Sequence, residues 1–541
     1  DWSSDVCSSD LHEGEGSLHA QLTQTGWITS LGAYNEPIDA ENGVFFISIG
    51  LTPSGANHID EVTDIVFSYI DLLRSEGPQA WYYEEEATVS KLGFEFKEQS
   101  SAMRTVTSLA SDLQYYPPQD INVAPYLMTA FDASLIDSYL SALRTDNVMI
   151  TIADPSYEGP SIEPWFEVPY GIKQGIGRAT AAQSIKDELT LPAPNPFLPS
   201  DLALKPGNDA RPRVVTDEEG LTLMLATDTE FGVPRAVTHV SIRSDRGLID
   251  LKDVVASNLY AYLVEDDLNT LGYPALLAGV SFEVATPPRG FRVTLGGYQD
   301  KQSVLLERVL ETLTTLAIAE DRFTTLKEEF RRSLENSSKD RPYQQGFSQL
   351  TDTLLESSWP ANSMITELEQ LTRPALAAWR DEYFSEVNVE GLIVGNVDEQ
   401  DASAIEQTVR EQLSLAPGPD RRPTVTQIKD RTDMKLEIDH DDAMMVIYAQ
   451  NDNDSLKARA SSSLLVHLLR PKYFTSLRTE QQLGYVVTAI QAEYENQGGV
   501  GFVIQSPVAS AQTLVDRTTQ FLDRQREALT SLEEEAFSEA K

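Results

Sequence analysis

Two spacings of apolar residues alternate along this chain. Short continuous apolar runs are typical of buried strands, and stretches with an apolar residue every three or four positions are typical of helices. The expected strands lie at Trp27–Leu31, Val44–Leu51, Val148–Ala153, Leu221–Ala226, Ala236–Ser244, Phe291–Gly296, Gly391–Gly395, Met444–Tyr448 and Val500–Gln505. The expected helices lie at Ile59–Leu73, Asp132–Leu143, Leu251–Leu271, Ser303–Ile318, around Trp379 and Tyr383, before Pro471, and at Gln512–Leu529. This order of elements predicts an α+β fold with helices over one face of each sheet.

Two polar, proline-bearing stretches interrupt the pattern, one from Thr190 to Pro212 and one from Pro417 to Pro423. The first stretch cannot be a core element and is the best domain boundary in the chain, and the second is a further break. We therefore expect αβ domains at residues 12–190, 213–416 and 417–541, with residues 191–212 as a linker. The order helix, Asn, strand within Asp132–Ala153 returns in the stretch that ends at Gly391–Gly395, which indicates an internal repeat.

Composition narrows the class of protein. With 541 residues the chain is long enough for several domains, and its formal net charge of −42 makes nucleic acid an unsuitable partner. No apolar run approaches the roughly 18–20 residues of a membrane helix. Residues 1–11 resemble translated adaptor sequence and are set aside as non-native. They contain Cys7, the single cysteine, so the remaining chain offers neither a disulfide nor a thiolate metal site.

The candidate chemistry lies between Tyr473 and Val487. A helix that breaks at Pro471 is expected to be followed by a helical turn with Arg478, and Gly484 stands where a left-handed C-cap belongs. Tyr485 then begins an extended run, so Arg478 and Tyr485 are expected to face one cleft. The guanidinium is a fork suited to carbonyl or carboxylate oxygens, and the phenol offers one hydroxyl donor.

A second interpretation of these two residues stays open. Arg478 can pair with Glu480 or Gln481 on a solvated helix face, since surface ion pairs are common and mostly inconsequential. Tyr485 would then be half-buried packing.

The run LRTEQQLGYVV resembles the C-terminal signature of the insulysin/pitrilysin family of insulinase-like zinc metallopeptidases, the inverzincins. Three further segments match: HEGEGSL resembles the opening of that family's second domain, GYQDKQSVLLERVLE its third, and GGVGFVIQSP the strand after the signature. The family has four tandem homologous αβ domains, each an antiparallel-rich sheet covered by helices, which close as a clamshell. The resemblance implies domains two, three and a truncated four, half of the clamshell, without the zinc-binding first domain.

The resemblance also implies roles for particular residues. Arg478 and Tyr485 would be catalytic: Arg478 would hold a substrate backbone oxygen, and Tyr485 would donate to the oxyanion. Glu13 and the strand residues Leu31, Gly32 and Ala33 would form a substrate exosite, which holds the peptide N-terminus by adding it to a strand edge. Ala33 replaces an expected glycine, which backbone pairing tolerates. The alternative is an ordinary edge strand with a surface glutamate.

Zinc in this family is bound by an H-x-x-E-H helix motif and a downstream Glu. The chain has six histidines, and none pairs at the helical spacing of three or four residues: His12, His19, His58, His239, His440 and His467. The acidic cluster around His440 is explained by a turn before the next strand. We therefore expect no metal ligands in this chain, with zinc as the cofactor of the intact protein.

Two functions remain at this stage. The first is part of a zinc-dependent endopeptidase that degrades peptides in an enclosed chamber, with peptide substrates and the missing N-terminal catalytic domain as partners. The chain alone is expected to be inactive. The second is a non-catalytic partner subunit or peptide-binding paralogue. A bacterial source would indicate a periplasmic or secreted protein, and otherwise a soluble one.

Overall fold

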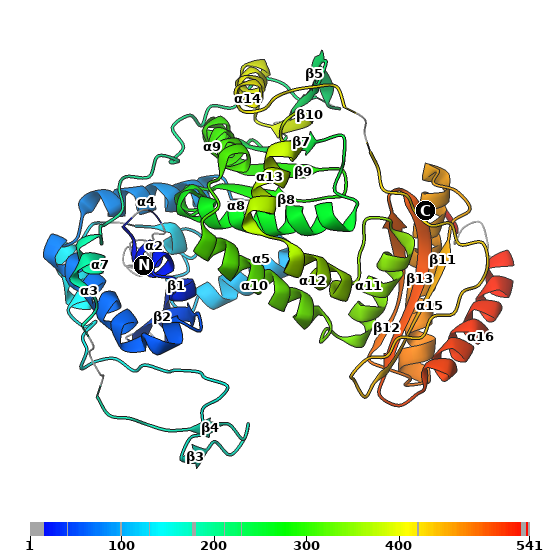
Figure 1. The fold of residues 1–541 in the computed structure, drawn as a ribbon, viewed down its shortest axis with the longest axis horizontal. Coiled ribbons are helices and arrows are strands. Elements are labelled where there is room, and N and C mark those ends of the chain that lie inside the picture. Colours follow the sequence, from blue (N-terminus) through cyan, green and yellow to red (C-terminus); the bar gives the residue numbers. More distant parts are fainter. Residues whose placement is uncertain are drawn as a thin grey trace.

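The computed structural model describes residues 14, 16–39, 42–97, 100–128, 130–175, 180–209, 211–228, 230–418, 421–531 and 537–538. Helices and strands gather in three regions that follow the sequence from one end of the molecule to the other (Figure 1). The expected α+β fold is confirmed, because each region combines antiparallel strands with helices packed on them.

The N-terminal region contains a two-stranded antiparallel sheet of β1 (Ile28–Pro37) and β2 (Gly43–Leu51). Leu22, Ile28 and Ile65 are fully buried in one core with the apolar side of α3 (Ile59–Glu76). The helices of this region are α2 (Leu18–Gln24), η1 (Gly55–Asn57), α3 (Ile59–Glu76), α4 (Ala80–Glu95), α5 (Ala102–Asp112), η2 (Ala124–Tyr126), α6 (Ala133–Leu140) and α7 (Gln183–Asp187).

The prediction of a strand at Val148–Ala153 is wrong. These residues are extended, exposed and outside any sheet, and the Met149 side chain is 87% exposed. An apolar run becomes a strand only where a partner strand accepts its backbone hydrogen bonds, and none of the described strands does so. The chain instead continues into a small hairpin, β3 (Ser161–Ile162) and β4 (Pro169–Tyr170), which projects from the body (Figure 1). The expected internal repeat therefore fails in its first copy.

The central region is built on a six-stranded mixed sheet in the order β5-β6-β10-β7-β9-β8. Strand β10 pairs parallel with β6 and antiparallel with β7, so a late segment is inserted between two early ones. The strands are β5 (Arg213–Glu218), β6 (Leu221–Thr227), β7 (Arg235–Arg243), β8 (Val280–Ala285), β9 (Phe291–Tyr298) and β10 (Asn388–Gly395). The helices are α8 (Leu251–Leu277), η3 (Gln299–Lys301), α9 (Gln302–Thr315), α10 (Glu320–Ser337), α11 (Pro342–Leu354), α12 (Ala361–Gln370), α13 (Arg373–Tyr383) and α14 (Glu399–Gln412).

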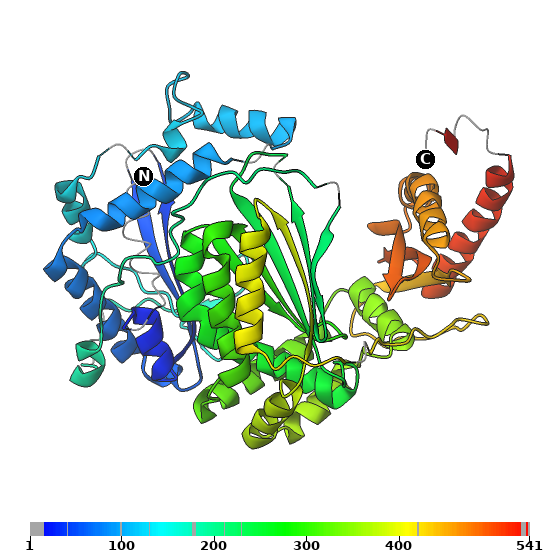
Figure 2. The same cartoon turned by 90° about the horizontal axis from the view of Figure 1, so that it is seen from above.

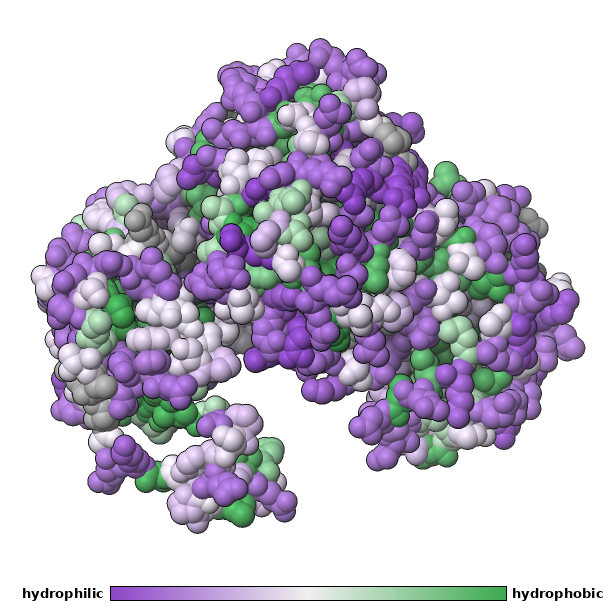
Figure 3. Space-filling view, in the orientation of Figure 1, coloured by the Kyte–Doolittle hydropathy of each residue, from purple (hydrophilic) through white to green (hydrophobic). Residues whose placement is uncertain are grey.

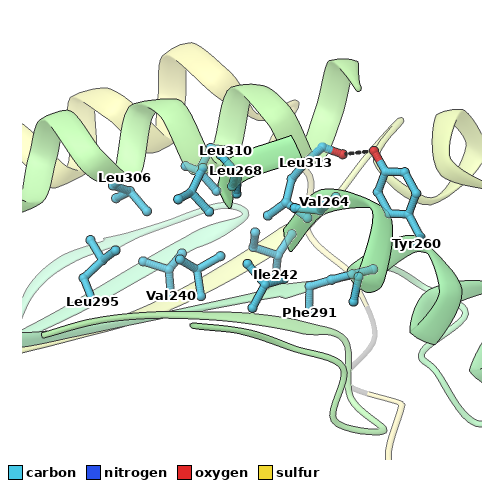
Figure 4. Packing of buried hydrophobic residues seen from close by; sticks show 14 of the residues in the cluster. Val240, Ile242, Tyr260, Val264, Leu268, Phe291, Leu295, Leu306, Leu310 and Leu313 are labelled. Atoms are coloured by element: carbon cyan, nitrogen blue, oxygen red, sulfur yellow. Dashed lines mark hydrogen bonds between the residues drawn. The ribbon is translucent and has the colours of Figure 1, made fainter. Parts of the chain in front are cut away.

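The largest core lies between this sheet and α8 and α9. Figure 4 shows side chains of β7 and β9 facing those of the two helices, and the Tyr260 hydroxyl donates to the Leu313 carbonyl at 2.8 Å. Burial of each Leu or Val side chain there stabilises the folded state by roughly 1.5–3 kcal/mol. The proline-rich stretch at residues 190–212 also contributes to this core, because its Phe197 side chain packs there and is only 3% exposed. The prediction that this stretch cannot be a core element is therefore wrong, because Phe197 packs in the central core.

The C-terminal region is a three-stranded antiparallel sheet, β11-β13-β12. Its elements are β11 (Ala443–Gln450), α15 (Leu456–Phe474), η4 (Thr475–Glu480), β12 (Val486–Tyr494), β13 (Gln497–Ser506) and α16 (Ala511–Thr530). All ten residues of the middle strand β13 are buried. Figure 2 shows this sheet apart from the central one, with α11 between them. Because α11 packs on β11 and β13, its contacts make it part of the C-terminal region, although it precedes β10 in the sequence.

The face of the molecule in Figure 3 is mostly hydrophilic, as expected for a chain with 84 acidic and 42 basic residues. No helix in the described ranges combines the length and the hydropathy needed to cross a membrane.

Candidate functional site

The connection between α15 and β12 carries the candidate residues. The prediction that the helix breaks at Pro471 is wrong. Helix α15 runs through Pro471 to Phe474 and continues as the π-helical turn η4. Proline removes one intrahelical donor without forbidding helical backbone angles. The helical turn then widens to the π form. The backbone N–H of Gln481 donates to the carbonyl of Ser476, five residues earlier, at 3.2 Å.

Arg478 points outward from this π turn. Its neighbour Leu477 is fully buried, which fixes the opposite face of the turn in the core. The Arg478 guanidinium lies 4.8 Å from the ring centroid of Phe474, a cation–π arrangement that holds the side chain in one place. Among the described residues, Arg478 forms neither an ion pair with Glu480 nor a hydrogen bond with Gln481. Its hydrogen-bonding face is therefore available to a ligand.

Gly484 is needed here for a reason other than the expected one. The left-handed residue in this connection is Gln482, with φ +51°, and the expected left-handed cap at Gly484 is wrong. A Cβ at Gly484 would lie 2.0 Å from the backbone carbonyl oxygen of Gln505. Glycine therefore allows the start of β12 to lie directly against β13.

Tyr485 lies between Gly484 and β12 and is 48% exposed. Its hydroxyl donates to Asp442 Oδ2 at 3.0 Å, and the Gln505 amide donates both to the phenolic oxygen and to the same Asp442 oxygen, the latter at 2.8 Å. The ring is thus held at the surface by two side chains. A half-exposed ring held in this way is compatible with both interpretations of Tyr485, the substrate-facing donor and the half-buried packing residue.

The charges around Tyr485 keep its phenol protonated. Partial burial raises the pKa of Tyr485, and the neighbouring Asp442 carboxylate raises it further. The hydrogen bond from Gln505 is the largest of the causes that lower the pKa of Asp442. At neutral pH a carboxylate therefore faces a neutral phenol, which is a competent hydrogen-bond donor.

The two candidate residues come from one connection, seven positions apart, and both side chains are solvent-facing. The π turn carries Arg478, and the close approach at Gly484 places the backbone beside Tyr485 against β13. The sequence pattern did not reveal Asp442 and Gln505 as partners of Tyr485. Gln505 carried a signal, because a glutamine at the end of an apolar strand is a buried polar group that needs a partner.

The candidate exosite residues lie on β1. Leu31, Gly32 and Ala33 pair with Ile49, Ser48 and Ile47 of β2, and Ala33 is buried. Within the described residues β1 has no second neighbour, so one edge is open for another strand. Glu13 lies outside the described residues.

The histidines do not form a metal centre in the part of the chain that the structure describes, where no three His, Cys, Asp or Glu side chains are grouped as ligands. His440 Nδ1 accepts the backbone N–H of Asp442 at 3.0 Å, as in the expected turn. His58 stacks on Trp27, and His239 contacts Thr294 at 3.0 Å. These side chains do not fit a zinc ion.

Three family models match the chain. The model described as the middle or third domain of peptidase M16 matches residues 94–367, the peptidase M16 inactive domain matches residues 11–89, and the PQQ synthase PqqF-like C-terminal lobe domain 4 matches residues 464–541. The first alone spans about half of the chain. The chain belongs to the M16 family of peptidases, the insulinase-like metalloproteases. The family resemblance expected from the sequence is confirmed.

Particular relatives agree with this assignment. The insulin-degrading enzymes of Bos taurus and Homo sapiens are each 30% identical to this chain over 547 residues, which cover 97% of the chain and 53% of the relative. The A-factor-processing enzyme of Saccharomyces cerevisiae is 27% identical over 556 residues, with 98% and 53% coverage. The chain thus spans about half the length of the curated relatives it matches.

The fold agrees with a solved structure. The crystal structure of pitrilysin aligns with a TM-score of 0.74 at 23% identity, over 100% of this chain and 59% of that one. At this identity the likeness shows the fold alone.

Proposed function

We propose that this chain is the substrate-binding and transition-state-stabilising part of a zinc-dependent endopeptidase that degrades peptides in an enclosed chamber. The zinc site would belong to a preceding first domain. Membership of the M16 family and the half-length coverage of the relatives support this proposal. The observation that carries it is the surface-held hydroxyl of Tyr485, on the same connection between α15 and β12 as the exposed, cation–π-stacked Arg478.

Tyr485 and Arg478 have distinct roles in this proposal. When a scissile carbonyl is attacked, its oxygen gains negative charge, and a fixed phenol donor stabilises that charge without reorganisation. Arg478 binds a substrate backbone oxygen with its guanidinium fork and so aligns the peptide. Neither role requires a metal ligand from this chain.

The rest of the chain would bind the substrate and shape the chamber. We assign residues 12–190 to a second domain, 213–416 to a third and 417–541 to a fourth, with 191–212 as the connection. In the second domain, Glu13 and the open edge of β1 at Leu31–Ala33 would hold the peptide N-terminus as an added strand.

A non-catalytic partner subunit or peptide-binding paralogue is the second candidate. One matching model describes an inactive domain, and the donors in the described residues do not fit zinc. The sequence encoded upstream discriminates between the two. An H-x-x-E-H motif there supports the enzyme, and its loss supports the partner subunit.

The purified chain is expected neither to retain stoichiometric zinc nor to cleave peptides, because it lacks a ligand pair at helical spacing. Elemental analysis after dialysis measures the metal, and an internally quenched peptide measures cleavage with and without chelator. The full-length protein is the positive control. Tightly bound zinc, or chelator-sensitive cleavage by the chain alone, would contradict the assignment of the metal to another domain.

Arg478→Ala in the full-length protein is expected to lower kcat/KM by about 10- to 100-fold, the loss expected for a hydrogen bond to a charged group. Part of the loss should appear as a raised KM. Arg478→Lys keeps the charge without the fork, so its activity should be intermediate. Arg526→Ala, which removes an exposed arginine of α16, is the matched control. Equal kinetics for Arg478→Ala and this control would contradict a substrate contact.

A further inference from the structure

The side chain of Gln505 has an unusual position for a polar group. It is fully buried on the middle strand β13, yet its amide reaches the exposed Tyr485. Its carbonyl oxygen accepts the backbone N–H of Tyr343 at 3.4 Å, in the first turn of α11. N–H groups in the first turn of a helix have no partner within the helix, so Gln505 satisfies one of them.

This contact decides which way the amide faces. With its oxygen directed to Tyr343, the Gln505 nitrogen must face Asp442 and Tyr485. Ionised Asp442 can only accept hydrogen bonds, so the phenol donates to Asp442 and accepts from Gln505. A phenol that accepts one hydrogen bond is polarised as a donor.

We propose that Gln505 is a positioning residue for Tyr485, and that the N-terminus of α11 fixes the Tyr485 hydroxyl through the Gln505 amide. This inference rests on the proposed function of Tyr485. It extends that function to Gln505 of strand β13 and to helix α11. Asp442 is the resting acceptor, which a substrate oxyanion would replace.

The arrangement makes a spectroscopic prediction. The titratable and charged groups near the phenol are Asp442 and His440 from the turn before β11, and Arg341 from the residue before α11. Burial and Asp442 raise the pKa of Tyr485, whereas the charge of Arg341 and the hydrogen bond from Gln505 lower it. Gln505→Met keeps the side-chain length and removes the donor, so the pKa of Tyr485 should rise. Asp442→Asn should lower it.

Carbon-13 NMR of the purified chain, labelled at the tyrosine ζ carbon, tests this inference. Tyr485→Phe identifies the signal, and pH titration follows its ionisation. Gln497→Met removes another buried glutamine of β13, which donates to the Asn451 carbonyl, and should leave the Tyr485 signal in place. An unchanged Tyr485 shift and pKa in Gln505→Met would overturn the proposal. Should that variant fail to fold, Asp442→Asn decides: an unchanged pKa overturns the arrangement, and a lowered one supports it.

Kinetics of the full-length protein separate this inference from the proposed function. Gln505→Met should lower kcat by about 5- to 10-fold with little change in KM, the effect of one lost hydrogen bond. Combined with Tyr485→Phe it should cost nothing more, because its effect passes through the hydroxyl. Additive losses would overturn the positioning role. If the NMR signal shifts but Tyr485→Phe is fully active, the positioning stands and the proposed function fails.

Discussion

Tyr485→Phe in the full-length protein is expected to lower kcat and kcat/KM together by about 10²-fold or more, because it removes a donor aimed at the transition-state oxyanion. The ring remains, and Gln505 keeps its hydrogen bond to Asp442 at 2.8 Å. The fold should therefore be nearly as stable as before. Steady-state kinetics on an internally quenched peptide give the activity, and circular dichroism with thermal unfolding checks the fold.

The control for this variant is Tyr115→Phe, which removes the hydroxyl of a tyrosine that is 72% exposed in the N-terminal region. It should leave both kinetic constants unchanged. A folded Tyr485→Phe protein with the kinetics of the control would mean that the hydroxyl takes no part in the reaction.

Gly484→Ala is expected to lower the free energy of unfolding by about 1–3 kcal/mol, as an overpacked core does. The added methyl group would meet the Gln505 carbonyl oxygen at 2.0 Å and its carbon at 2.9 Å, and backbone atoms of a central strand cannot turn aside. The strands must separate locally, which displaces Tyr485. Activity of the full-length protein should therefore fall toward that of Tyr485→Phe. Urea unfolding of the chain measures the stability.

Gly93→Ala is the matched control for this substitution. A Cβ at Gly93 in α4 meets no atom within 4 Å, and alanine favours helices by up to about 1 kcal/mol over glycine. This variant should be unchanged or slightly stabilised. If Gly484→Ala unfolds at the same urea concentration as the control, the close approach of the two strands is not required.

The sequence predicted elements whose periodicity is set by local burial. Ala236–Ser244 matches β7, whose Val240 and Ile242 are fully buried. Val44–Leu51 matches β2, but only part of its apolar side chains pack on the core, and Val44 and Phe46 are exposed. Val148–Ala153 has the same apolar character but no partner strand among the described residues. The strand predicted there from its apolar residues was therefore wrong. Pro471 shows the opposite case, in which the helix α15 runs through a residue that usually breaks helices.

The candidate site was predictable only in part. Arg478 and Tyr485 were found because they lie close in sequence within one recognisable run. Their supports were not found, since Asp442 lies 43 residues from Tyr485 and the Tyr343 contact spans 162 residues. Gly484 was singled out correctly as special but for a dihedral reason, whereas the cause is a neighbouring strand that no local pattern reveals.

The insertion of β10 between β6 and β7 also has a consequence for synthesis of the protein. Strand β10 begins at Asn388, about 150 residues after β7 begins at Arg235, so its two partners leave the ribosome long before it does. At about 5–20 residues per second, the facing edges of β6 and β7 wait roughly 8–30 s for it. During that interval two apolar strands of the nascent chain have unpaired backbone groups. The central sheet therefore cannot be completed until residue 395 has emerged from the ribosome.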